Sequence, residues 1–192
     1  MNDLFIIILS AVFVNNVILM QFLGMCPFFG VSKSLKPALG MSAAVTFVMT
    51  IASFVTWLVY WLVLEPLSAQ YLKIVIFIFV IASLVQLVEL VIKKYSQPLY
   101  KTLGIYLPLI TTNCAILGVA FLNITNEYHL FNSIVYGFSA GVGFTIALLL
   151  MAGIRERLEL GETPRAMQGA PIAFITASLI SLAFLGLKSF MG

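Results

Sequence analysis

The segment Leu107–Gly118 reads LPLITTNCAILG, and it places a proline, two threonines, an asparagine and a cysteine inside a long apolar run. A simple membrane anchor would carry leucines at these positions. Irregular, polar backbone at membrane depth is tolerated only where it is buried in protein or lines a cavity. The N-terminal part has an echo of this segment, because Asn113–Leu117 and Asn15–Leu19 both fit Asn-x-x-Ile-Leu. We therefore expect these two segments to form the functional centre, with the other helices holding them in place.

The composition excludes a soluble domain. Of the 192 residues, 62% are hydrophobic and only 9% are charged, and the mean hydropathy is +1.12. A soluble domain carries about 25% charged residues. The sequence therefore predicts an all-α integral membrane protein, a single membrane domain over residues 1–192 that is surrounded by lipid. The net charge of +3 does not indicate nucleic-acid binding, because the basic residues lie in short loops.

Apolar runs of about 20 residues suit a helix that crosses roughly 30 Å of hydrocarbon, and the sequence predicts six of them. The N-terminus lacks a positively charged start, so we interpret the first run as a retained helix and not as a cleaved signal peptide. The glycines and the proline of Gly24–Gly30 are expected to break the chain after the first span. The six spans are expected at about residues 4–23, 38–64, 72–92, 100–122, 130–154 and 171–187.

The short loops predict the orientation in the membrane, because basic residues favour the cytoplasmic side. Eight basic residues fall on one side and two, Lys73 and Lys188, on the other. This distribution predicts a multi-pass protein of a cytoplasmic (inner) membrane with both termini outside. The eight are Lys33, Lys36, Lys93, Lys94, Lys101, Arg155, Arg157 and Arg165.

The two halves of the chain repeat each other. Gly40–Phe47 and Gly137–Phe144 share Gly, Ser, Ala, Val and Phe at an offset of 97, and Ala82–Leu84 matches Ala177–Leu179 at an offset of 95. The Asn-x-x-Ile-Leu segments are offset by 98. Each half holds three spans, so the halves, about 1–97 and 98–192, must be inverted relative to each other. Inverted repeats place their site near the midplane where discontinuous helices meet, which here are spans one and four.

The two cysteines, Cys26 and Cys114, both fall in these broken segments. A buried cysteine is most often a small hydrophobic residue, and the usual spacing of metal ligands is absent. A metal-binding interpretation is also open. Two thiolates are half of the four that an iron–sulfur cluster needs, so a cluster would require two more from another chain.

Five polar residues precede the cysteines in the two broken segments. One interpretation is that they hydrogen-bond between helices. The other is that they donate to cluster sulfurs or line an ion path. The group consists of Asn15, Asn16, Thr111, Thr112 and Asn113. Further along, Gly137 and Gly141 form a Gly-x-x-x-Gly pattern typical of close helix packing, and Arg155–Arg157 is expected to cap the fifth helix.

The broken segments resemble those of the A subunit of the Rnf complex. The resemblance runs the full length of the chain, and its motifs are long and specific. The D and E subunits of the Na+-translocating NADH:quinone oxidoreductase share the plan, but Asn15-Asn16 and Cys26-Pro27 are more similar to the Rnf protein. The matching segments are Asn15-Asn16, Leu23–Phe28, Val31–Lys33, Leu103–Gly118, Tyr136–Ala140 and Ile154–Leu158.

The resemblance implies a complex that moves electrons between reduced ferredoxin and NAD while driving Na+ or H+ across the membrane. It implies that Cys26 and Cys114 supply two ligands of an intramembrane 2Fe-2S cluster and that the E subunit, oppositely oriented, supplies the other two. The two cysteines, 88 residues apart, would then lie close together. The B, C, D and G subunits are the further partners implied, and this chain would bind neither NAD nor flavin.

Other function classes remain open from the sequence. A D- or E-type subunit of the quinone-reducing enzyme shares the plan, and a secondary transporter shares inverted repeats and broken helices. A structural scaffold is a third class. Iron analysis of the purified pair of subunits separates an electron carrier from the last two.

Overall fold

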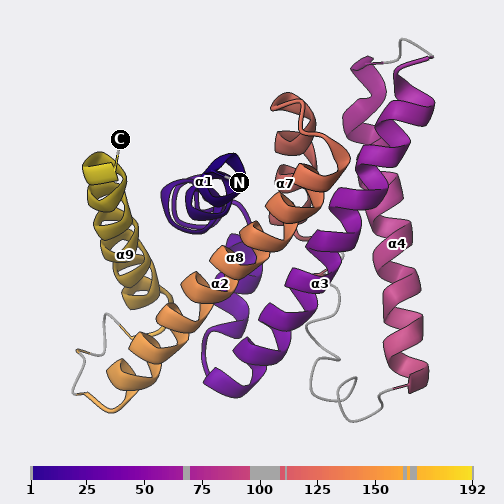
Figure 1. The fold of residues 1–192 in the computed structure, drawn as a ribbon. Coiled ribbons are helices and arrows are strands. Elements are labelled where there is room, and N and C mark those ends of the chain that lie inside the picture. Colours follow the sequence, from indigo (N-terminus) through magenta and orange to yellow (C-terminus); the bar gives the residue numbers. More distant parts are fainter. Residues whose placement is uncertain are drawn as a thin grey trace.

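The chain folds as a bundle of helices around two long central ones. The computed structural model describes residues 2–66, 70–95, 109–110, 112–161, 164 and 168–191, and every element among them is helical. In Figure 1, α8 crosses the molecule diagonally with α3 beside it, while α4 and α9 lie at opposite edges. The elements are α1 (Asn2–Leu9), η1 (Ser10–Val14), α2 (Met25–Val31), α3 (Leu35–Val59), η2 (Tyr60–Leu64), η3 (Gln70–Leu72), α4 (Lys73–Tyr95), α7 (Cys114–Thr125), α8 (Leu130–Glu159) and α9 (Ala170–Met191).

Helix length separates two kinds of element. Among the described residues, three apolar helices are long enough to cross a membrane: Leu35–Leu64, Lys73–Val91 and Leu130–Glu159. They coincide with predicted spans two, three and five. Shorter apolar helices occupy Leu4–Val14, Cys114–Thr125 and Ala170–Gly186. Each half begins with a short helix followed by a long one, while the six-span inverted plan stays a prediction. Lys101 and Arg165, used for the orientation, lie outside the described residues.

The first break lies earlier than the sequence predicted. Helical structure stops at Val14, and Met25–Val31, expected to be irregular, is the helix α2. The expectation was wrong because Gly24, with φ +79°, is the N-cap of α2 and Pro27 falls in its first turn. Proline is tolerated in the first turn of a helix because those N–H groups lack intrahelical partners in any case. The glycines and the proline therefore start a helix here instead of breaking one.

Asn16 satisfies the backbone at the true break. The last turn before it is a π-helix, closed by Asn15 N–H donating to Ser10 O at 2.6 Å. The fully buried Asn16 side chain accepts from Ile18 N–H at 3.1 Å and donates to the carbonyl oxygens of Val12 and Gly143. Because buried backbone groups must be paired, this one amide allows the chain to leave the helix inside the protein.

α3 and α8 form the central pair, and small residues bring them together. A Cβ added at Gly141 would lie 2.7 Å from Thr46 Cγ2, and one added at Gly137 would lie 2.8 Å from Ser53 Cβ. Thr46 Oγ1 and Thr145 Oγ1 share a hydrogen bond of 3.2 Å across the same contact. The close packing predicted from Gly137 and Gly141 is confirmed. Small residues at such contacts let two helix backbones approach closely.

Replacing Gly141 with alanine should test this contact. The added methyl group meets Thr46 backbone and side chain, so we expect a loss of about 1–3 kcal/mol in unfolding free energy. Heat-induced unfolding of the purified protein in detergent measures it. Gly153→Ala, in the same helix with nothing within 4 Å, is the control and should be neutral or slightly stabilising. Equal unfolding temperatures for the two variants would contradict this packing.

Candidate functional site

Both cysteines stand at the beginning of a helix. Cys26 is in the first turn of α2, and Cys114 is the first residue of α7. Both are free thiols and both side chains are exposed. The sequence explains the second position locally, because the Asn113 side chain accepts a hydrogen bond from Ala115 N–H at 3.0 Å and so begins α7 at Cys114.

Gly24 brings the two helix starts together. A Cβ at Gly24 would lie 3.0 Å from Ala115 Cβ, 3.1 Å from Asn113 Oδ1 and 3.2 Å from Phe144 Cε2. Its positive φ and this crowding both require glycine. Cys26 follows Gly24 by two residues, and Cys114 lies between Asn113 and Ala115 in the chain. The segments that carry the two cysteines are therefore side by side, although 88 residues of sequence separate the thiols (114 − 26 = 88).

Asn113 carries a donor without a partner. Its side chain is 4% exposed, and its Oδ1 is used by the cap, but its Nδ2 has no hydrogen-bond partner among the described residues. A buried amide N–H group that stays unpaired costs free energy, and such groups call for a specific explanation. Asn113 is next to Cys114 in the chain, and its Oδ1 lies against Gly24. An anionic or sulfur-containing group held by the cysteines would give its Nδ2 a partner.

The other predicted polar residues separate into different roles. Asn16 uses its donors on backbone carbonyls, as described above, so the interhelical interpretation fits it best. Asn15 Nδ2 donates to Ser10 Oγ at 3.2 Å. Thr112 is exposed and lies beside Cys114, whose Sγ is 3.9 Å from Thr112 O. Thr111 lies outside the described residues.

Asn16 and Asn113 make the same local hydrogen bond in the two halves. Each side-chain oxygen accepts from the backbone N–H two residues later. Their separation is 113 − 16 = 97, the offset of the Gly40 and Gly137 segments. The sequence pattern had aligned Asn113 with Asn15 instead. The local structure thus makes Asn16 the closer counterpart of Asn113.

An apolar groove opens beside Cys114. It has a volume of about 530 Å³ and runs between α4 and the start of α7. Thr112, Asn113 and Cys114 line one wall, and Gln86 and Glu89 of α4 contribute polar groups to the other. Sequence reasoning had not connected Glu89 with Cys114. The 3.6-residue spacing of Ile78, Ala82 and Glu89 on one helix face was the available signal.

α2 is fixed at its other end by Arg155. The guanidinium Nη1 donates to Phe29 O at 2.9 Å and to the buried Ser32 Oγ at 2.8 Å. Arg155 was expected to cap its own helix, α8, and this expectation was wrong. The last carbonyl groups of α2 lack intrahelical partners, and a cation reaching across from α8 satisfies one of them, that of Phe29. The helix with Cys26 is therefore anchored at both ends, to α7 at Gly24 and to α8 at Arg155.

The donor set fits half of a metal cluster. Within the described ranges, no group of three or more His, Cys, Asp or Glu side chains is placed to hold a metal ion. Two exposed thiols at adjoining helix starts supply two soft ligands, and a 2Fe-2S cluster takes four. The partial positive charge at the start of the twelve-residue α7 favours an anionic group there. A second set of ligands would have to come from a partner that covers the exposed face.

Comparison with known proteins assigns relatives to the whole chain. A family model described as "Rnf-Nqr subunit, membrane protein" matches residues 4–191. The A subunit of the Na+-translocating ferredoxin:NAD+ oxidoreductase complex of Acetobacterium woodii is 57% identical over 183 residues, which is 95% of each chain. The A subunit of an ion-translocating oxidoreductase complex from Syntrophotalea carbinolica is 54% identical over 97% of this chain and 96% of its own. The corresponding protein from Actinobacillus pleuropneumoniae is 53% identical over the same shares.

Replacing Arg155 with leucine should release the C-terminal end of α2. Two hydrogen bonds to a cation are lost and the buried Ser32 hydroxyl loses its donor, so we expect amide hydrogen exchange over residues 28–32 to accelerate at least tenfold, equivalent to about 1.4 kcal/mol. Exchange measured by mass spectrometry on the purified protein reports this. Arg157→Leu, an exposed arginine two residues further along α8, is the control. Unchanged exchange in Arg155→Leu would show that α2 does not depend on this anchor.

Proposed function

The chain belongs to the Rnf-Nqr family of membrane subunits, and from that premise we propose that it is the A subunit of an ion-translocating ferredoxin:NAD+ oxidoreductase. Its relatives carry this name over nearly their full length at more than half identical residues. In this proposal the chain moves electrons within the membrane while the complex transports Na+ or H+. It acts without a nucleotide site of its own and is not catalytic alone.

The observation that carries the proposal is the meeting of the two cysteine segments at Gly24. We propose that Cys26 and Cys114 supply two thiolate ligands of a 2Fe-2S cluster and that the E subunit of the complex supplies the other two. The cluster, when bound, provides a one-electron carrier near the middle of the membrane. The exposure of both thiols supports this arrangement, because ligands shared between two chains must lie on the surface of each.

The side chains around the cysteines would tune such a cluster. Hydrogen bonds to cluster sulfurs are among the main determinants of iron–sulfur potentials. We assign this role first to Asn113, whose buried Nδ2 has no partner among the described residues. Thr112, beside it, and Thr111 are further members of the surrounding shell. Asn15 and Asn16 hold the break in the first half, Asn16 through backbone groups and Asn15 through the Ser10 hydroxyl.

The remaining partners follow from the same assignment. We propose direct, pseudo-symmetric contact with the E subunit, and a place in an assembly with the B, C, D and G subunits. Electrons would pass through the chain between the iron–sulfur protein in the cytosol and the flavin on the outer face. The exposed apolar side chains on α4 and α9 suit contact with lipid or with these membrane partners.

The proposed orientation places both termini outside the cytoplasmic membrane. Because eight of the ten basic residues fall on one side of the predicted spans, we expect reporter fusions after Gly192 and within the Glu65 loop to behave as external. Fusions after Glu159, where α8 ends, should behave as cytoplasmic. Alkaline phosphatase activity and green fluorescence of paired fusions measure the two sides. Phosphatase activity after Glu159 would contradict the orientation.

Serine in place of either cysteine should abolish the shared cluster. Serine is nearly the same size, so the complex should still assemble, but the optical and spin-resonance signals of the 2Fe-2S cluster and the ferredoxin-to-NAD electron transfer should be lost. Iron content and spectra of purified Cys26→Ser and Cys114→Ser complexes measure this. A Cys114→Ser complex that keeps both signal and rate would falsify the assignment.

Replacing Asn113 with aspartate tests whether its Nδ2 donates a hydrogen bond to the proposed cluster. Aspartate keeps the cap on Ala115 N–H but removes the Nδ2 donor and adds negative charge, so the cluster should remain and its reduction potential should fall. A lost hydrogen bond of about 1 kcal/mol corresponds to roughly 40 mV for a one-electron couple. Redox titration of the purified complex measures this shift. An unchanged potential would remove Asn113 from the proposed shell.

A further inference from the structure

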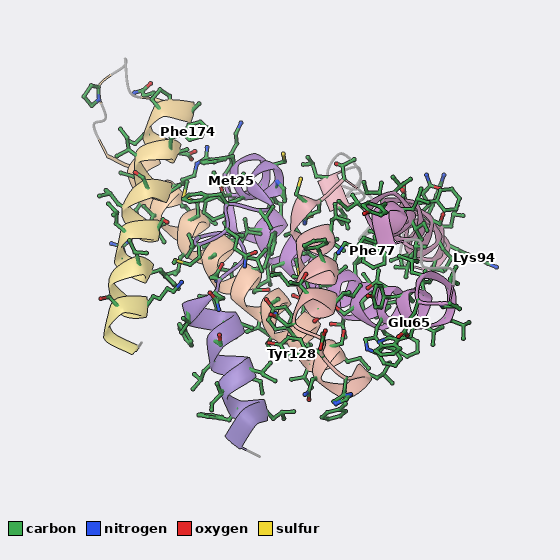
Figure 2. The ribbon with its side chains drawn as sticks, turned by 90° about the horizontal axis from the view of Figure 1, so that it is seen from above. Met25, Glu65, Phe77, Lys94, Tyr128 and Phe174 are labelled. Carbon is green, nitrogen blue, oxygen red and sulfur yellow. The ribbon has the colours of Figure 1, made fainter. Side chains whose placement is uncertain are left out.

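A second cavity lies between η2 and the turn that joins α7 to α8. It has a volume of about 360 Å³, and we call it the Glu65–Glu127 cavity after the two carboxylates that line it. Trp57, Tyr60 and Trp61 of α3 and η2 form one wall, and Asn123, Tyr128 and His129 belong to the other. Figure 2 labels Glu65 and Tyr128 well away from Met25 at the start of α2. The cavity is therefore separate from the cysteine segments.

Asn123 is the least expected residue in this cavity. It is 1% exposed, and neither its Nδ2 nor its Oδ1 has a hydrogen-bond partner among the described residues. A buried amide that leaves both polar atoms unpaired destabilises the fold, and an apolar residue of the same size would remove that cost. Because Asn123 also lines the cavity, a ligand or its water is the natural partner for the amide. Sequence reasoning did not single out Asn123 and gave His129 no role.

Glu127 occupies a backbone position that favours glycine. Its φ is +51°, in the left-handed region, where α7 ends. Tyr128 N–H donates to Asn123 O at 3.1 Å and Glu127 N–H donates to Ile124 O at 3.0 Å, which is the pairing of a glycine-type helix end. Strained positions of this kind cluster at functional sites. A glutamate here places a carboxylate at the cavity at the expense of backbone stability.

The opposite wall is irregular as well. η2 is a π-helix, closed by Glu65 N–H donating to Tyr60 O at 3.0 Å, and such segments occur frequently at functional sites. It brings Tyr60 and Trp61 into edge contact, with ring centroids 6.3 Å apart. Trp57 Nε1 donates to Tyr128 O at 2.9 Å and ties this wall to the α7–α8 turn. The cavity is thus held open by fixed elements.

We propose that the Glu65–Glu127 cavity binds a monovalent metal cation together with part of its water shell. Two carboxylates, an amide oxygen and aromatic faces attract cations, and no lysine or arginine is among the described residues that line the cavity. Among the described residues, no group of three or more His, Cys, Asp or Glu side chains is placed to hold a metal ion, so the lining does not form the ligand set of a zinc or other transition-metal site. The cavity is larger than a bare ion, so water completes the coordination and satisfies Asn123. The inference rests on the proposed function, in which the complex transports Na+ or H+, and deepens it, but it does not depend on the cluster.

The test is local hydrogen exchange in the purified complex. Amides of residues 122–130 are followed in NaCl or KCl and in choline chloride of the same ionic strength. We expect a saturable, at least threefold slowing in one of the alkali salts for the natural chain. Asn123→Leu and Glu127→Gly should lose this dependence while the complex unfolds at an equal or higher temperature, because both changes suit the local fold. Glu156→Gln, exposed near the end of α8, is the matched control and should keep it.

Three results would overturn the proposal. They are no alkali-dependent slowing in the natural chain, the same slowing in Asn123→Leu and Glu127→Gly, or slowing with MgCl2 or choline chloride but with neither NaCl nor KCl. Iron content measured on the same samples keeps this test separate from the proposed function. A complex that lacks iron but keeps the cation dependence refutes the cluster alone.

Discussion

The fold depends on one constraint. Where the chain leaves a helix inside the protein, each backbone N–H and C=O group must find a hydrogen-bond partner. Water is not available there, so each break must bring its own hydrogen-bond partners. Asn16 and Asn113 meet this need in the two halves by the same means, a side-chain oxygen that accepts from the N–H group two residues later. The difference between them is informative. Asn16 also uses its donors on Val12 and Gly143, whereas the buried donor of Asn113 has no partner in the described part of the chain.

Residues of α8 contact the segments at both helix breaks and hold them in place. Gly143 accepts from Asn16, the neighbouring Phe144 lies against Gly24, and Arg155 near the end of the same helix donates to Phe29 O near the end of α2. α3 supports α8 from the side through contacts at Gly137 and Gly141 that leave no room for a methyl group. A pair of long, tightly packed helices thus sets the positions of two short segments. Because the two long helices fix their positions, the two interrupted segments can be short and still be held rigidly.

Much of this plan is visible in the sequence. Apolar runs predicted the long helices, and the two Asn-x-x-Ile-Leu segments lie at the end of η1 and at the start of α7. The position of the first break was wrong, because Gly24 and Pro27 are compatible with a helix start as well as with a helix end. The bonds of Arg155 to α2 join residues more than 120 positions apart, and no local pattern encodes such contacts. The Glu65–Glu127 cavity was missed for a similar reason, since an unpaired amide such as Asn123 is recognised only from its surroundings.

The exposure of both thiols has a consequence for the life of the chain before assembly. A newly inserted copy presents Cys26 and Cys114 on its surface, on segments that Gly24 keeps together. Accessible thiols are the ones that cellular oxidants modify first, through sulfenic acid to a disulfide or to irreversible products. A partner that covers this face therefore also shields it. The order in which the subunits assemble therefore determines how long the two thiols stay accessible. A copy of the chain without its partner is the one most exposed to oxidative damage.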